Sequence, residues 1–331
     1  MLPDNDSDLF SFPVDEGRHP GCGQEWWYLQ SHLNSGNRHF AFILCYFISQ
    51  IKISALVDID NQRFHFGISQ EKDGDIETTE GYLELSKGGS WWREEGTFSY
   101  RLHEEIEEKS GGLPTVDLRL SSLKRPVPIS GGRVKMGRNG YSYWYAQTRI
   151  EAGGEVALNG EQEEVQGVAW IDRQWGDWNR MGFGGWKWFS MHLEDQREVA
   201  ICTTFEPISG RHLLSFCQII EPDGSFRLAK YPVVRDIGIW TSPKNWLYSS
   251  GWHISCKPLD FEAVLTPSVA NQEFYDGLWE GSCSTEIKIG GEQIPGVAFA
   301  EINLGKYAPF MIKYLSYVKA IGMGTLDRLR R

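Results

Sequence analysis

The chain carries the same pattern of residues twice, once in each half of its 331 residues. The stretch EWWYLQSHL at 25–33 aligns without a gap on GWKWFSMHL at 185–193, so that Trp26 meets Trp186. Both stretches are rich in aromatic residues, as buried β-strands often are. Because β-strands resemble one another by chance, this match alone has little weight.

A second match follows the first in each half. The stretch VQGVAWIDRQWG at 165–176 aligns on IPGVAFAEINLG at 294–305, with Gly-Val-Ala and the closing Gly identical. This alignment places Asp172 opposite Glu301. Because the two matches occur in the same order in both halves, they predict a duplicated β-domain.

The boundary between the two copies is expected in the glycine-rich, polar stretch GDWNRMGFGG at 176–185. We therefore expect one domain over residues 1–180 and a second over residues 181–331. A duplicated antiparallel unit of this size is typical of two barrels or strongly curved sheets. A barrel of about eight strands can hold one small ligand.

Short strand patterns dominate the chain. Stretches such as HFAFILCYFIS at 39–49 and TVDLRLSS at 115–122 are rich in aromatic and β-branched residues and are bounded by polar residues or glycine. A hairpin turn is expected at Gly153-Gly154. Helical periodicity is scarce until FMIKYLSYVKAI at 310–321. The sequence therefore predicts an all-β fold with a short C-terminal helix.

The composition argues against several classes of function. A formal net charge of −11 disfavours binding to nucleic acid or to anionic membranes, which require a basic face. The longest apolar run, at 40–48, is too short to span a bilayer, and the acidic N-terminus lacks the apolar region of a signal peptide. The six cysteines show no CxxC pairing and no zinc-like spacing. We therefore expect a reduced, cytoplasmic protein without stable membrane insertion.

Sequence motifs for cofactors and for common hydrolases are missing. The chain contains no GxSxG elbow, no P-loop and no HExxH, and its eight histidines show no ligand-like spacing. We therefore expect no metal, no nucleotide cofactor and no ordinary serine-hydrolase mechanism.

The 14 tryptophans are the unusual feature of the composition. Most of these rings are expected in the core, and a minority could line a pocket for an apolar small molecule. The candidates for such a lining lie in the repeated stretches: Trp26, Trp170, Trp175, Trp186 and Trp188. Lys187 is a candidate donor to a ligand, but on a strand it points away from its two indole neighbours and could extend to solvent instead.

An acid and a base stand next to each other between two of these tryptophans. Neighbouring residues on a strand point to opposite faces, so Asp172 and Arg173 cannot both enter one barrel. Asp172 is either a ligand-facing acid or one half of a buried ion pair. Glu25 is a candidate acid or base, although we favour its pairing with Arg173. Tyr28 is a candidate hydrogen-bond donor to a ligand or a residue of a core strand.

The segments EWWYLQSHL, GVAWIDRQWGDW and GWKWFSMHLEDQREVA look like those of the AttH/CrtC-like family of two-domain lipocalin-like proteins. This family includes carotenoid hydratases, and decalin-forming Diels–Alderases are similar in fold. The resemblance implies two lipocalin-like antiparallel β-barrel domains, with a ligand space lined by both barrels or lying between them.

The resemblance also implies roles for individual residues. Asp172 matches the Asp with which the hydratases are thought to protonate an isolated alkene, and Trp170 matches the aromatic residue two positions before it. The hydratases usually have His at the next position, where this chain has Arg173. An ion pair with Arg173 would lower the pKa of Asp172 and make it a weaker acid.

Two functions are compatible with these observations. The first is a cofactor-independent enzyme that binds an apolar isoprenoid or polyketide and catalyses its hydration or cyclisation, including cycloaddition. Its candidate catalytic residues are Asp172, Arg173, Tyr28 and Glu25. The second is a non-catalytic carrier of a pigment or lipid. An enzyme should present polar groups to an otherwise apolar site, whereas a carrier can have every polar group paired.

Overall fold

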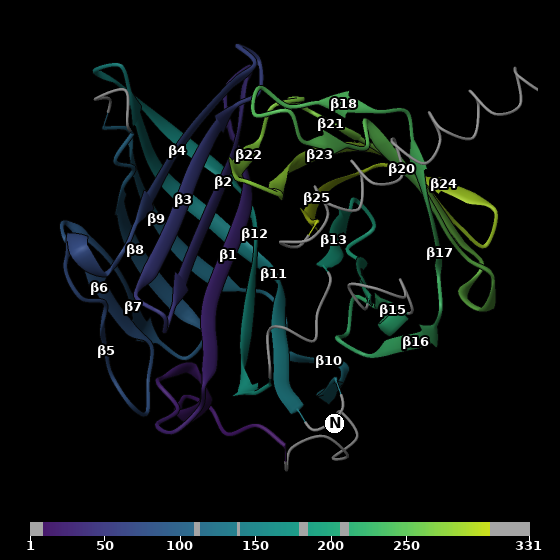
Figure 1. Ribbon diagram of the computed structural model, residues 1–331, viewed down its shortest axis with the longest axis horizontal. Helices are drawn as coiled ribbons and strands as arrows, with labels where there is room; N and C mark the ends of the chain where they lie inside the picture. Colours follow the sequence, from purple (N-terminus) through teal and green to yellow (C-terminus); the bar gives the residue numbers. More distant parts are fainter. Residues whose placement is uncertain (1–8, 109–112, 138–139, 179–184, 206–211, 305–331) are drawn as a thin grey trace, which may run out of the picture.

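The chain forms two large, curled antiparallel sheets (Figure 1). The computed structural model describes residues 9–108, 113–137, 140–178, 185–205 and 212–304. The expected domain boundary between residues 180 and 181 and the expected helix at 310–321 lie outside these residues. No helix within the described ranges is long and apolar enough to cross a bilayer.

The first sheet is built from the N-terminal half of the chain. Its strands follow the order β4 (Arg63–Ser69), β3 (Ile51–Asp58), β2 (Arg38–Phe47), β1 (Gln24–Ser35), β12 (Glu161–Asp177), β11 (Gly140–Leu158), β9 (Thr115–Ser122), β8 (Ser99–Glu105), β7 (Ser90–Gly96), β6 (Glu84–Lys87) and β5 (Glu77–Thr78), with β10 (Val127–Met136) paired to β11. The short 3-10 helices of this half are η1 (Val14–Glu16) and η2 (Glu71–Asp73).

The second sheet is built from the C-terminal half. Its strands follow the order β16 (Phe226–Lys230), β15 (His212–Ile220), β14 (Glu198–Phe205), β13 (Gly185–Leu193), β25 (Gly296–Asn303), β23 (Leu278–Ile289), β21 (Phe261–Pro267), β20 (Gly251–Cys256) and β17 (Val233–Ile237), with β22 (Glu273–Tyr275) and β24 (Glu292–Ile294) paired to β23. A separate ribbon of β18 (Trp240–Thr241) and β19 (Leu247–Tyr248) and the 3-10 helix η4 (Lys257–Leu259) complete this half.

The two sheets have the same topology. Strands β1 to β4 correspond in order to β13 to β16, and β12 and β11 correspond to β25 and β23. Tyr28 on β1 pairs with Asp172 on β12, and Trp188 on β13 pairs with Glu301 on β25. This is the register that the alignment of the two halves predicts. The predicted fold class, all-β with two lipocalin-like antiparallel domains, is confirmed.

Strands β1 and β12 are buried on both faces. Trp27 and Leu29 on β1 and Ile171 on β12 point into the first sheet, whereas the alternate residues Tyr28 and Trp170 belong to clusters shared with the second sheet. A strand of an antiparallel sheet commonly has one solvated face. The continuous burial of β1 and β12 therefore identifies them as strands between the two domains.

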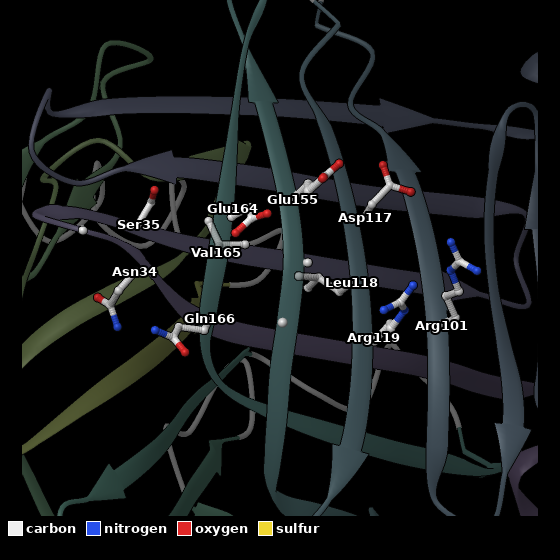
Figure 2. A pocket seen from close by; sticks show the side chains of 13 residues that line it. Asn34, Ser35, Arg101, Asp117, Leu118, Arg119, Glu155, Glu164, Val165 and Gln166 are labelled. Carbon is white, nitrogen blue, oxygen red and sulfur yellow. The ribbon is translucent and has the colours of Figure 1, made fainter.

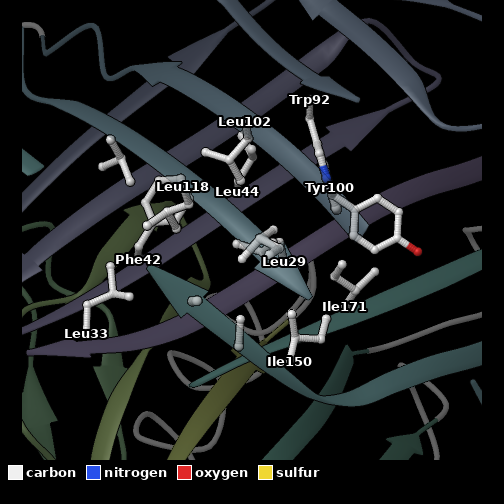
Figure 3. Close-up of a cluster of buried hydrophobic side chains, with 14 of the residues drawn as sticks. Leu29, Leu33, Phe42, Leu44, Trp92, Tyr100, Leu102, Leu118, Ile150 and Ile171 are labelled. Atoms are coloured by element: carbon white, nitrogen blue, oxygen red, sulfur yellow. The ribbon is translucent and has the colours of Figure 1, made fainter. Parts of the chain in front are cut away.

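Hydrophobic side chains fill the inside of the curled first sheet. Figure 3 shows part of this cluster, which includes Leu33, Phe42, Leu102, Leu118 and Ile150. The inside of the first sheet is therefore a packed core. The ligand space that the family resemblance implies has to be sought between the two sheets.

Equivalent residues of the two copies meet between the domains. Gln30 and Ser190 occupy equivalent positions, and Gln30 Nε2 donates to Ser190 Oγ. His32 Nε2 lies 3.2 Å from Ser282 Oγ, and the equivalent His192 Nε2 donates to the Thr148 carbonyl at 2.8 Å. Reciprocal contacts of this kind arise when two like units pack around a two-fold axis. The duplicated domains thus form a pseudo-symmetric pair.

A buried ionic cluster joins the two domains beside these contacts. Lys124 Nζ, from the loop between β9 and β10, donates to Glu198 Oε2 on β14 at 2.7 Å. Arg149 Nε on β11 donates to Glu198 Oε1 at 2.5 Å. Two cations of the first domain therefore neutralise one fully buried carboxylate of the second, which fixes the relative position of the domains.

We expect Lys124→Met to destabilise the protein by roughly 3 kcal/mol, because it removes one of the two cations on the buried Glu198 and the hydrogen bonds that Lys124 donates to the Gln196 and Glu221 carbonyls. Urea-induced unfolding would measure this loss. The control is Lys72→Met, which changes an exposed lysine of η2 and should have little effect. Equal stability of the two variants would show that the cluster does not hold the domains together.

Candidate functional site

Asp172 lies between the two domains, on the face of β12 that packs against the second sheet. Only 4% of its surface is exposed. Trp144 Nε1 on β11 donates to Asp172 Oδ1 at 3.0 Å. The Trp144 ring lies 5.0 Å from that of Trp188, which in turn lies 6.1 Å from that of Trp170. The carboxyl is therefore surrounded by indoles contributed by both domains.

This environment favours the neutral form of the carboxyl. Burial raises the pKa of Asp172 to about 7, against a lesser lowering by the indoles of Trp144 and Trp170. Within the described parts of the chain no basic side chain forms an ion pair with Asp172. A buried acid without a cationic partner retains its proton near neutral pH.

A second buried carboxyl, Glu280 on β23, lies on the other side of Tyr28. The Tyr28 hydroxyl is within hydrogen-bond distance of Glu280 Oε1 and lies 2.9 Å from Gln30 Oε1. Glu280 is 1% exposed, and burial followed by the charge of Glu301 raises its pKa well above the usual range. Tyr28, the strand partner of Asp172, thus connects this region to a second buried acid, Glu280.

The third carboxyl is Glu301 on β25, the counterpart of Asp172 in the second copy. It is the direct strand partner of both Trp188 and Glu280. Burial raises the pKa of the Glu301 carboxyl to about 7, a hydrogen bond from Trp186 lowers it, and the charge of Asp172 raises it further. Part of the Glu301 residue still reaches solvent, unlike Asp172 and Glu280.

Arg173 and Glu25 lie on the opposite face of the first sheet. Arg173 donates to Glu25 Oε1 at 2.8 Å and to the Gly17 carbonyl at 2.5 Å. Its guanidinium also lies 4.2 Å from the centre of the Trp27 ring. The pairing that the sequence analysis favours for Glu25 is therefore present.

The sequence analysis expected Arg173 to lower the pKa of Asp172 only if the two residues form an ion pair. They do not pair, and burial raises the pKa of Asp172. The reason is the alternation of side chains along β12, which directs Arg173 to Glu25 and leaves Asp172 among indoles.

The candidate aromatic residues separate into two groups. Trp170, Trp186 and Trp188 belong to the cluster between the domains that contains Trp144. Trp175 lies on the face of Arg173, where its ring stacks on that of His19 at 4.0 Å.

The remaining two candidates lie at the edge of the site or away from it. Trp26 contacts the rings of Phe47 and Trp178. Lys187 points away from the interdomain cluster and forms an ion pair of 2.5 Å with Asp236 on β17.

Sequence reasoning missed two residues of this site. Glu280 lies in the stretch LWEGSC, where the repeat offers no signal because its counterpart in the first copy, by strand pairing, is Ala146. Trp144 lies in the aromatic stretch YSYWYA, in which nothing distinguishes it from core residues.

A hollow of about 830 Å³ lies elsewhere, on the outer face of the first sheet (Figure 2). Arg101 and Arg119 line it and alternate along their strands with the core residues Leu102 and Leu120. The hairpin turn expected at Gly153-Gly154 is wrong, because both residues lie within β11. Gly154 instead allows close strand approach, since a Cβ at this position would lie 1.9 Å from the Asp117 carbonyl oxygen. The mixed charges of this hollow do not suit an apolar ligand.

Across the described ranges, no group of three or more His, Cys, Asp or Glu residues could hold a metal ion. The arrangement between the domains is instead three acids, one phenol and several indoles. Such a set can donate and accept protons in a largely apolar environment.

The fold is shared with two solved structures. An AttH protein from Nitrosomonas europaea is 20% identical, with a TM-score of 0.75 over 92% of this chain and 99% of that one. Kievitone hydratase from Nectria haematococca is 15% identical, with a TM-score of 0.74 over 90% of this chain and 94% of that one. At these identities the likeness concerns the fold.

No curated protein matches the sequence. The model of the AttH-like family matches residues 3–305, which is nearly the whole chain. This protein therefore belongs to the AttH-like family.

Proposed function

We propose that this protein is an enzyme that adds water across an isolated carbon–carbon double bond of an apolar small molecule, with Asp172 as the proton donor. One observation carries the proposal: Asp172 is a buried carboxyl, without a cationic partner among the described residues, whose surroundings are indoles of both domains. Keeping such a group buried costs stability, and groups of this kind cluster at functional sites.

The chemistry follows from these surroundings. An alkene is protonated only by an acid that is still neutral, and a pKa of about 7 keeps much of Asp172 neutral at physiological pH. Proton transfer to carbon creates a carbocation. Indole rings stabilise cations, and the rings of Trp144, Trp170 and Trp188 cluster beside Asp172, whose new carboxylate would stabilise the cation further.

This chemistry also limits the substrate. A branched alkene, as found in isoprenoids, forms a tertiary carbocation and is the easiest isolated alkene to protonate. Hydration is redox-neutral, so acid and base groups suffice for it and no cofactor is required. The name of one structural neighbour, kievitone hydratase, supports a water-adding reaction on this fold.

Three alternatives are less well supported. Cycloaddition needs a donor to a substrate carbonyl, and the candidate donor Arg173 is bound to Glu25 on the other face of β12. Proton-triggered cyclisation would start from the same cation, with an internal nucleophile in place of water. A carrier would not require three acids without cationic partners between its domains, and Asp172, Glu280 and Glu301 are such acids within the described residues.

We expect Asp172→Asn to lower the rate of hydration by about 10²–10⁴-fold, because Asn is nearly isosteric but cannot deliver a carboxylic proton. The assay would follow conversion of a panel of isoprenoid alkenes, including dimethylallyl phenols, to products heavier by one water. The matched control, Asp276→Asn, changes an acid whose side chain is 73% exposed and should leave the rate unchanged. Full activity of Asp172→Asn would remove the proposed role.

We also expect the pH dependence of stability to report the proton on Asp172. The folded protein holds this proton up to about pH 7, whereas the unfolded chain releases it near pH 4, so stability falls as the pH rises between these values. Asp172→Asn should remove up to about 1.4 kcal/mol per pH unit from that slope. Urea unfolding between about pH 5 and 7 measures it. Identical slopes for both proteins would mean that Asp172 is ionised when folded.

A further inference from the structure

The Tyr28 hydroxyl has one hydrogen but two acceptor oxygens within reach. These are Glu280 Oε1 and, at 2.9 Å, Gln30 Oε1. The Gln30 amide is oriented so that its Nε2 donates to Ser190 Oγ, which leaves its oxygen facing the tyrosine. Because the phenol can donate only once, one of the two contacts must receive its hydrogen from the other side.

With the Gln30 amide in this orientation, a protonated Glu280 carboxyl is the group that can supply that hydrogen. Tyr28 thus bridges Glu280 and Gln30, and Gln30 donates to Ser190. Burial raises the pKa of Glu280 well above its usual range, which agrees with this protonation. Glu280 is thus hydrogen-bonded to Tyr28 and, being protonated, cannot accept a further proton.

The other two carboxyls differ in their surroundings although they occupy equivalent positions. Asp172 is enclosed by Trp144 and Trp170, whereas the Glu301 residue partly reaches solvent beside Trp186. Burial raises the pKa of each carboxyl to about 7, and the charge of Asp172 raises that of Glu301 further. Two acids that interact in this way tend to share one proton near neutral pH, so that one is neutral when the other is ionised.

We infer that Glu301 is the general base of the site and takes the proton from the attacking water. This inference rests on the proposed function. Asp172 gives its proton to one alkene carbon, and the water oxygen forms a bond to the carbocation. One O–H bond of that water then breaks, and its proton goes to the Glu301 carboxylate. The alcohol leaves with one water added, and transfer of a proton from Glu301 to Asp172 restores the starting state.

The position of Glu301 suits this role better than that of Glu280. Part of the Glu301 residue reaches solvent, whereas Glu280 is 1% exposed and hydrogen-bonded to Tyr28. As direct partners on neighbouring antiparallel strands, Glu280 and Glu301 have Cβ atoms about 4.5–5.5 Å apart. Protonated Glu280 therefore adds no repulsion to an ionised Glu301.

The test is Glu301→Gln, assayed with dimethylallyl phenols in the presence and absence of sodium azide. Hydration should fall about 10²–10⁴-fold, as is typical when a general base is lost. Azide is already an anion and needs no base, so it should restore turnover and yield the azide adduct. Asp172→Asn should not be restored by azide, because its missing step is the protonation. Glu286→Gln, a change of an exposed glutamate on β23, is the matched control and should behave as wild type.

The pH profile separates a base from a structural residue. Wild-type activity should fall at low pH, where the base is protonated, and at high pH, where the acid is ionised. Glu301→Gln should lose the fall at low pH and keep the fall at high pH. If the Gln variant does not fold, Glu301→Asp keeps a carboxylate and should retain part of the activity with both limbs of the profile.

Different failures have different meanings. Full hydration activity in Glu301→Gln, or a reduced activity that azide does not restore, would overturn the role of Glu301. The proposed function would survive that result if Asp172→Asn is inactive. A wild-type protein that hydrates no member of the alkene panel would count against the proposed function itself.

Discussion

The packing of one curled sheet against the other determines the chemistry available to this protein. It buries both faces of β1 and β12, and it places Tyr28 and Asp172 against Glu280 and Glu301 of the second sheet. A single sheet of this kind would leave the face that carries Asp172 in water, where a carboxyl has an ordinary pKa. Closing two such faces on each other is what raises the pKa values of these acids.

The buried acids of the chain differ in their partners; Glu16, whose pKa burial raises to about 7, is hydrogen-bonded to Tyr100 and Gln147 in the first sheet. Glu25, Glu104 and Glu198 each have a basic partner: Arg173, Lys52 and Lys124, respectively. These pairs connect strands or domains, and their charges are compensated. Asp172, Glu280 and Glu301 have no such partner among the described residues, and the pKa of each is raised by burial. A fold gains no stability from leaving acids in this state, which is why we assign them to function.

Duplication explains how the acids came to be arranged around one axis. Asp172 and Glu301 are equivalent residues of the two copies, and so are Tyr28 and Trp188. The copies have since diverged: the counterpart of Glu280 is Ala146, which packs among the indoles around Asp172. One half of the site is therefore aromatic and apolar, and the other contains a phenol and two acids. Such a difference in environment is what assigns opposite roles to two similar acids.

The sequence by itself determined the features that depend on local pattern. The repeat predicted the common topology and the register that sets Asp172 opposite Glu301, and strand alternation predicted that Asp172 and Arg173 point to opposite faces. These follow from neighbours along one chain segment and from the two-residue period of a strand.

Tertiary structure alone decided which face each residue took and what it met there. The pairing of Arg173 with Glu25 left Asp172 without a cation, and the contact of Tyr28 with Glu280 joins residues far apart in the chain. Neither Trp144 nor Glu280 carries a local signal for its role, because desolvation depends on the whole surrounding shell of side chains. A pKa is a property of that shell, and the shell exists only after the two domains have packed together.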